Sequence, residues 1–193
     1  MSCKVFATLW DGTPVFEIFP TPIVGVNLLK SKVHIDDRGS FTKTFHAGFF
    51  AANGMDFTPC EQFFSISKKH VLRGLHFQLP PSDHAKLVFC ASGRILDVVV
   101  DLRLGTNFAR VHSCELGASG GELLFIPKGC AHGFLSLEED SVVFYLTDSV
   151  HDPSRDAGIL WNSTGFDWGI SAPVLSSRDA GFPPLAEFSS PFA

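Results

Sequence analysis

Short apolar runs separated by turn-forming residues recur along most of the chain. Runs such as KLVFCA, RILDVVVDLRL, ELLFIP and SVVFYLT are divided by ASG, GTN, GASGG and PKG. Val, Leu and Phe at this close spacing are typical of the short strands of a sandwich or barrel. The contiguous valines Val98, Val99 and Val100 interrupt strict alternation, which indicates a strand buried on both faces. The pattern therefore predicts an all-β fold.

Helical segments are expected at only two places. Residues 45–55, FHAGFFAANGM, are suited to one short helix, and residues 154–158, SRDAG, to one further turn. Strands and helices do not alternate, which argues against a nucleotide-binding fold of the Rossmann type. Residues 174–193 are rich in Pro and Ser, so we expect an extended tail that packs on the body through its Phe side chains.

One strand-like run, VLRGLHFQ at residues 71–78, contains a histidine among apolar residues. In a regular strand Arg73 and His76 would lie on opposite faces. Gly74 can kink or bulge the strand and turn both side chains toward one cavity. The alternative is a half-exposed histidine on a polar face.

Length and composition fit a single domain over residues 1–193, with its core at about 20–170 followed by the tail. Hydrophobic residues make up 45% and charged residues 18% of the chain, which is the composition of a globular protein. The net charge is -5, and Lys and Arg are scattered. Because binding to a phosphate backbone needs clustered positive charge, no nucleic-acid partner is expected.

The beginning of the chain, MSCKVFATLW, lacks the basic and apolar regions of a signal peptide. No apolar run approaches the roughly 20 residues of a membrane span. We therefore expect a cytoplasmic protein with no membrane partner. The five cysteines are odd in number and form no C-x-x-C pair, so neither a disulfide framework nor a zinc knuckle is expected.

The stretch GELLFIPKGCAH, residues 121–132, has the spacing G-x5-P-x-G-x2-H. It is similar to the second sequence motif of the cupin jelly-roll barrels. In those barrels a strand, a Pro-Gly turn and the next strand carry a histidine into the interior. The resemblance places His132 inside a barrel.

The first cupin motif supplies H-x-H as metal ligands, whereas this chain has His76, Phe77 and Gln78 at the corresponding place. With Gln at the second ligand position the usual ligand set cannot close, so we expect no metal and no cofactor. His84 is a possible replacement ligand, but the preceding residues Pro80, Pro81, Ser82 and Asp83 favour a loop residue.

Several longer segments carry a more specific resemblance. They are DDRGSFTKTF, VLRGLHFQLPP, KLVFCASGRILDVVVDLRLGTNF, LLFIPKGCAHGFLSL, VVFYLTDSVHDPSRDAGILWN and LSSRDA. From about residue 20 to 185 the chain resembles the dTDP-4-dehydrorhamnose 3,5-epimerases. The resemblance implies a metal-free isomerase with a cupin-like double-stranded β-helix, commonly a homodimer. Its substrate would be a nucleotide-linked 4-keto-6-deoxyhexose, in deoxysugar synthesis for a surface polysaccharide such as O-antigen or for a glycoside.

Epimerisation beside a C4 ketone needs three groups: a base at the carbon, a donor at the enolate oxygen, and an acid on the opposite face. The resemblance assigns the base to His76, whose ordinary pKa of about 6.5 allows it to accept a proton. It also assigns Asp179 as the carboxylate that orients His76, Tyr145 as the acid, and Lys86 as the donor near the enolate oxygen. The alternatives are a turn-capping Asp179, a core Tyr145 and a solvated Lys86.

Further residues are expected to bind the substrate. The resemblance places Arg73 near the diphosphate, where a guanidinium fork suits phosphate geometry. The alternative is a solvated surface charge. Asp97 and Asp101 are candidates to orient His132, or are solvated strand ends. By the same resemblance the substrate-binding set comprises Arg73, His132, Gln78, Arg38, Glu61 and His151.

The binding positions depart from the family pattern. His151 stands where a tyrosine is common, Phe63 and Phe64 replace polar residues, and Lys43 replaces a glutamate. These changes leave open the nucleotide, with dTDP as the default and CDP or GDP as options, and whether C3, C5 or both are inverted. The alternatives are a 3,4-ketoisomerase with the same substrate class and a non-catalytic sugar-binding barrel.

Overall fold

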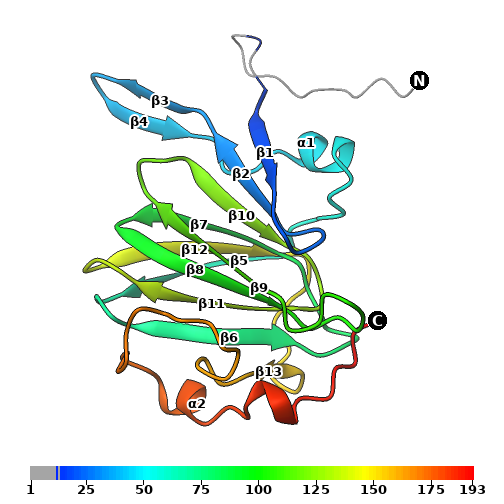
Figure 1. Cartoon of the computed structure of the whole chain (residues 1–193). Helices are drawn as coiled ribbons and strands as arrows, with labels where there is room; N and C mark the ends of the chain where they lie inside the picture. Colours follow the sequence, from blue (N-terminus) through cyan, green and yellow to red (C-terminus); the bar gives the residue numbers. More distant parts are fainter. Residues whose placement is uncertain (1–11, 13) are drawn as a thin grey trace.

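Two antiparallel sheets face each other in the computed structural model, which describes residue 12 and residues 14–193 (Figure 1). The larger sheet has six strands in the order β1-β2-β10-β7-β12-β5. Their bounds are β1 Phe16–Pro20, β2 Asn27–Ser31, β5 Glu61–Ser67, β7 Lys86–Ser92, β10 Glu122–Ile126 and β12 Ser141–Thr147. The segment MSCKVFATLW, on which the expectation of a cytoplasmic protein partly depends, lies outside the described residues.

The smaller sheet has five strands in the order β13-β6-β11-β8-β9. Its members are β6 Leu72–Gln78, β8 Arg94–Asp101, β9 Val111–Gly117, β11 Cys130–Ser136 and β13 Asp156–Gly158. Val98, Val99 and Val100 are 0% exposed on β8, between β11 and β9. The prediction of a valine strand buried on both faces is thus confirmed.

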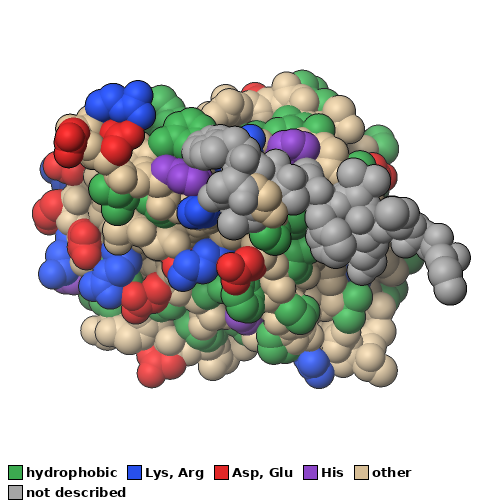
Figure 2. All heavy atoms as spheres, turned by 90° about the horizontal axis from the view of Figure 1, so that it is seen from above, with side chains coloured by type: hydrophobic (Ala, Val, Ile, Leu, Met, Phe, Trp, Pro, Cys, Tyr) green, Lys and Arg blue, Asp and Glu red, His purple; other side chains and the backbone are tan. Residues whose placement is uncertain are grey.

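A separate hairpin, β3 Val33–Asp36 and β4 Gly39–Thr42, projects away from the two sheets (Figure 1). Ile35 on this hairpin is 80% exposed. Arg38 lies in its turn, and its guanidinium pairs with Asp36 at 2.5 Å. On the face seen in Figure 2, Lys and Arg side chains are interspersed with Asp and Glu instead of forming a patch of one sign.

Helices are short. The expected helix at 45–55 is present as α1 Ala47–Ala52, which is capped by the His46 ring and buries Phe49 and Phe50. The expected helical turn at 154–158 was wrong. Asp156–Gly158 forms strand β13 because its backbone pairs with the edge strand β6. The described residues contain no helix long and apolar enough to span a membrane.

The tail runs beside β6 and β13 at the lower edge of Figure 1. It contains α2 Ser177–Ala180 and a 3₁₀ turn, Leu185–Glu187, within otherwise extended chain. Phe192 is 5% exposed, and both Phe188 and Phe192 pack edge-on against Phe77. The expected aromatic anchoring of the tail is confirmed. α2 holds Asp179 against the smaller sheet, so the tail contributes a predicted site residue to this side of the fold.

Candidate active site

A cavity of 330 Å³ opens between the two sheets. Strands β6 and β11 of the smaller sheet form one wall, and β5, β7 and β12 of the larger sheet form the other. Four histidines line it, namely His76, His84, His132 and His151, together with Lys86 and Tyr145. A wider hollow of 660 Å³ along hairpin β3–β4 contains Arg38 but none of the other predicted site residues.

A bulge in β6 explains how Arg73 and His76 reach the same cavity. His132 of β11 pairs with His76, whereas Phe134, two residues further, pairs with Arg73, so β6 carries an extra residue between the two pairs. Gly74 lies in this bulge with φ 130°, a backbone conformation that residues other than glycine rarely adopt. A Cβ on Gly74 would lie 2.5 Å from Gly133 Cα. The predicted bulge at Gly74 is confirmed.

His76 and Asp179 form a hydrogen-bonded pair. The Nε2–H of His76 donates to Asp179 Oδ1 at 2.9 Å, and the backbone N–H of Gly74 donates to Asp179 Oδ2 at 3.2 Å. Burial would raise the pKa of Asp179, but the hydrogen bonds from His76 and Gly74 hold it below its usual value. Because an ionised carboxylate only accepts, Nε2 carries the imidazole proton and Nδ1 is left with a lone pair. Burial lowers the pKa of His76, so its ring is neutral near pH 7.

Lys86 begins β7 and is 8% exposed. Its ammonium donates to the backbone carbonyl of His76 at 3.2 Å, which places a cation beside the histidine. Burial lowers the pKa of Lys86 to about 8, so the charged form still predominates at neutral pH. The interpretation of Lys86 as a solvated surface charge is therefore excluded.

Tyr145 lies on β12, in the sheet opposite His76, and is 8% exposed. Its hydroxyl is 3.3 Å from Ser65 Oγ, and Phe63 stacks on its ring at a centroid distance of 4.8 Å. Burial raises the pKa of the Tyr145 phenol above its usual value, so the group is a neutral proton carrier. The ring of His132 meets it edge-on at 6.2 Å from across the cavity.

His132 occupies the interior position that the Pro-Gly turn spacing predicts, at 3% exposure. Its Nε2 is 2.8 Å from Asp97 Oδ2, and Asp97 is fully buried. The other candidate, Asp101, pairs with Arg103 instead. Of the two aspartates, Asp97 is therefore the one that orients His132.

Gln78 joins two loops at the rim of the cavity. Its Oε1 accepts from the backbone N–H of Asp152 at 2.6 Å, and its Nε2 donates to the Ser82 carbonyl at 2.7 Å and is 2.8 Å from His84 Nδ1. On the same rim, the backbone N–H of His151 donates to Glu61 Oε2 at 3.0 Å. His84 is in a loop, as expected, but it also lines the cavity.

Two charged residues that line the cavity, Arg178 and Asp156, were not predicted from the sequence. Arg178 pairs with Asp156 at 2.6 Å and lies over the Phe182 ring at 5.1 Å. Phe182 in turn meets the ring of His76 edge-on at 5.7 Å. Because Arg178 directly precedes the predicted site residue Asp179, the sequence could have indicated that Arg178 lies near the cavity. Among the described residues, two predicted binding residues do not line this cavity: Glu61 lies beside it, bonded to the His151 backbone, and Arg38 lies on hairpin β3–β4.

The residues do not suit a resident metal. Within residue 12 and residues 14–193, no group of three or more His, Cys, Asp or Glu is arranged to hold an ion. Gln78, at the second ligand position of the cupin motif, uses its side chain to bind the two rim loops. His84 faces Gln78 through Nδ1 and is not grouped with other ligands.

A jelly-roll barrel with an interior cavity lined by the histidine of a His–Asp pair, a buried lysine and a buried tyrosine is the scaffold of an acid–base enzyme. The family model for dTDP-4-dehydrorhamnose 3,5-epimerase matches residues 20–187, and the chain belongs to this family. The predicted family and the cupin-like fold class are thereby confirmed.

Individual relatives agree with this assignment. The dTDP-4-dehydrorhamnose 3,5-epimerase of Salmonella typhimurium is 38% identical over 87% of this chain and 94% of its own length. The Legionella pneumophila 3,5-epimerase in complex with dTDP-4-keto-L-rhamnose is 31% identical with a TM-score of 0.86, over 90% of this chain and 95% of that chain. A 3'-monoepimerase from Streptomyces bikiniensis in complex with dTDP-quinovose is 32% identical with a TM-score of 0.81, over 86% and 87% of the two chains.

Proposed function

We propose that the protein is a metal-independent isomerase that epimerises C3, C5 or both of a nucleotide-linked 4-keto-6-deoxyhexose in deoxysugar synthesis. The observation that carries this proposal is the placement of His76 and Tyr145 on opposite sheets, facing one cavity. Inversion requires a proton to leave one face of the sugar and another to arrive on the opposite face. Two proton carriers on facing walls meet that requirement.

The reaction begins when His76 Nδ1 takes the proton from the carbon beside the ketone. The electron pair of the broken C–H bond forms a C=C bond, and the carbonyl electrons move to the C4 oxygen. Lys86, charged and shielded from water, stabilises the resulting enolate. Asp179 stabilises the imidazolium through its bond to Nε2. The Tyr145 hydroxyl then delivers a proton to the opposite face of the carbon, and solvent exchange restores both side chains.

Substrate binding is assigned to the remaining polar residues of the cavity and its rim. Arg73 lies at one end of β6, where its guanidinium is fixed by Ser67 Oγ at 3.0 Å and meets the diphosphate. His132, Gln78, Glu61 and His151 surround the sugar end. The family default makes dTDP the expected nucleotide. The 3'-monoepimerase among the similar structures keeps inversion of one centre open for this chain.

The protein is further proposed to act as a homodimer in the cytoplasm. Arg38, with a side chain 90% exposed, projects on a hairpin away from its own cavity, together with the exposed Ile35. On the edge strand β5, Phe64 and Ile66 are 58% and 55% exposed. Association of two chains would cover this apolar surface and bring Arg38 of one chain to the cavity of the other. Light scattering that finds a monomer at micromolar concentration would refute the dimer.

The function is tested by incubating the protein in D₂O with dTDP-, CDP- and GDP-linked 4-keto-6-deoxyglucose and following the sugar by NMR. Deuterium should enter C3, C5 or both, and the configuration at the labelled carbon should invert. A product in which the carbonyl has moved to C3 would identify a 3,4-ketoisomerase. Binding without any exchange would identify a non-catalytic sugar-binding barrel, and either result would refute the epimerase.

A further inference from the structure

The orientation of the Gln78 side-chain amide is set by backbone groups whose roles are unambiguous. The N–H of Asp152 can only donate, so the Gln78 atom 2.6 Å away is the oxygen. The carbonyl of Ser82 can only accept, so the Gln78 atom 2.7 Å away is the nitrogen. The amide therefore cannot be turned over without breaking both bonds.

This orientation determines the protonation of His84. Gln78 Nε2 has two hydrogens, and its two shortest bonds go to the Ser82 carbonyl and to His84 Nδ1 at 2.8 Å. The Val150 carbonyl, at 3.4 Å, is the more distant acceptor. His84 Nδ1 must accept the second hydrogen, so it carries no proton, and the proton of the neutral ring is on Nε2. Burial and the nearby charge of Lys86 lower the pKa of His84 to about 3, in agreement with a neutral ring.

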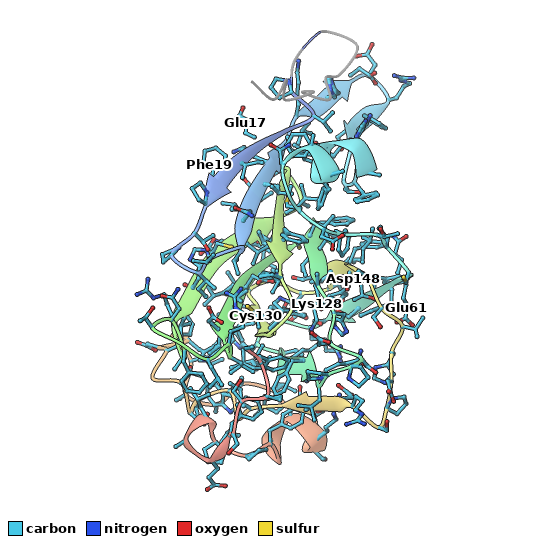
Figure 3. The ribbon with its side chains drawn as sticks, turned by 90° about the vertical axis from the view of Figure 1, so that its right-hand side faces the viewer. Glu17, Phe19, Glu61, Lys128, Cys130 and Asp148 are labelled. Atoms are coloured by element: carbon cyan, nitrogen blue, oxygen red, sulfur yellow. The ribbon has the colours of Figure 1, made fainter. Side chains whose placement is uncertain are left out.

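The loop holds His84 firmly in the cavity wall. The backbone N–H of the next residue, Ala85, donates to Asp148 Oδ1 at 2.7 Å. The side chains of Asp148 and Lys128 are labelled in Figure 3; Asp148 Oδ2 and Lys128 Nζ are 3.7 Å apart. His84 lines the cavity, and its Nε2 makes no hydrogen bond to any of the described residues. A fixed N–H donor is thus left for a ligand.

The position of His84 indicates which part of a ligand it meets. Gln78 is five residues from Arg73 along β6, and because the bulge takes up one of these residues, the two ends of this wall are about 13 Å apart. His84 is at the Gln78 end, and Lys86, two residues later, lines the same cavity. With the diphosphate at Arg73, the sugar extends past His76 toward His84.

We propose that His84 is a specificity-determining residue that donates a hydrogen bond from Nε2–H to a carbonyl or hydroxyl oxygen of the substrate sugar beside Lys86. This assignment rests on the proposed function. A neutral donor of fixed direction favours a sugar with an oxygen at that place and disfavours a deoxy position, because the bound sugar would cover the donor and leave it unpaired.

The tautomer is tested first, by ¹⁵N NMR of the wild-type protein without ligand. His84 should show its proton on Nε2 at pH 7. In Gln78→Glu a carboxylate oxygen replaces the amide nitrogen that faces His84, so the proton should move to Nδ1 or the ring should become charged. A wild-type His84 with its proton on Nδ1, or a doubly protonated ring, overturns the assignment.

The sugar contact is tested by calorimetric titration with dTDP and with dTDP-quinovose, which has no C4 ketone and does not react. CDP or GDP equivalents are used if the wild-type protein exchanges deuterium only with those substrates. His84→Phe should weaken binding of the nucleotide sugar about 3- to 10-fold and leave the nucleotide alone unchanged. His84→Gln, which keeps an N–H donor, should restore most of the loss.

Equal weakening of both ligands, or no weakening of either, in a folded His84→Phe protein overturns the assignment while the wild-type activity stands. A wild-type protein that exchanges no deuterium and binds none of the ligands overturns the proposed function, and the role of His84 with it. The two failures are therefore distinguishable, because one appears only in the variant and the other in the wild type.

Discussion

Replacing Asp179 with asparagine should disable His76, the proposed base, while changing almost nothing in the shape of the site. Asp179 is 4% exposed and holds two donors, His76 Nε2–H on one oxygen and the Gly74 N–H on the other. An asparagine has one acceptor for these two donors. Because the Gly74 N–H cannot become an acceptor, the asparagine oxygen is expected to face Gly74 and its amide group to face His76.

That arrangement reverses the tautomer of the histidine. His76 Nε2 would have to accept from the amide, so the ring proton would move to Nδ1, the nitrogen proposed to remove the substrate proton. Restoring the productive tautomer leaves a buried donor unpaired, at about 1–3 kcal/mol, and the lost charge-assisted bond to the imidazolium costs about 1.5–3 kcal/mol. Together these effects slow the reaction by about 10²- to 10⁴-fold.

The assay is the rate of deuterium incorporation at the sugar carbons in D₂O, with urea unfolding to show that the variant is folded. His76→Asn, which has no base, supplies the lower limit. The exchange rate of Asp179→Asn should approach that limit, and ¹⁵N NMR should show the His76 proton on Nδ1. A folded Asp179→Asn protein that keeps more than a tenth of the wild-type rate would refute the proposed orientation of His76 by Asp179.

Four further predictions concern the same site. Tyr145→Phe should still exchange solvent deuterium into the starting sugar with retained configuration but form little inverted product; equal loss of both signals would remove Tyr145 from the mechanism. Activity should fall at acid pH only below 6.5, where His76 with its lowered pKa becomes protonated, and at alkaline pH as Lys86 loses its proton near pH 8. In Lys86→Arg the alkaline loss near pH 8 should disappear, since arginine stays charged, and an unchanged profile would contradict the role of Lys86. Dialysis against EDTA should leave activity intact, whereas a required stoichiometric metal found by elemental analysis would overturn the metal-independent mechanism.

Phe63 restricts the position of Tyr145, the proposed acid. The two rings stack at a centroid distance of 4.8 Å. The phenol is therefore held from one side by an apolar surface and from its end by Ser65. A tyrosine confined in this way has a restricted range from which to reach the sugar carbons.

The sequence by itself determined the local elements of this protein. Repeated apolar runs predicted the strands, the three valines predicted the doubly buried strand β8, and the Pro-Gly spacing predicted the interior position of His132. These features depend on the periodicity and chemistry of neighbouring residues, which the chain displays directly. The family resemblance added His76 and Asp179, whose 103-residue separation no local pattern could bridge.

Only the tertiary structure decided which groups face one another. Asp97 and Asp101 are equivalent in sequence as partners for His132, and the pairing of β8 with β11 selected Asp97. Residues 154–158 had the composition of a turn, but the unpaired edge of β6 made three of them a strand. The protonation of His84 depends on two loops that meet at Gln78. Such outcomes depend on strand register and on contacts between distant segments, where a shift of one residue turns a side chain to the other face.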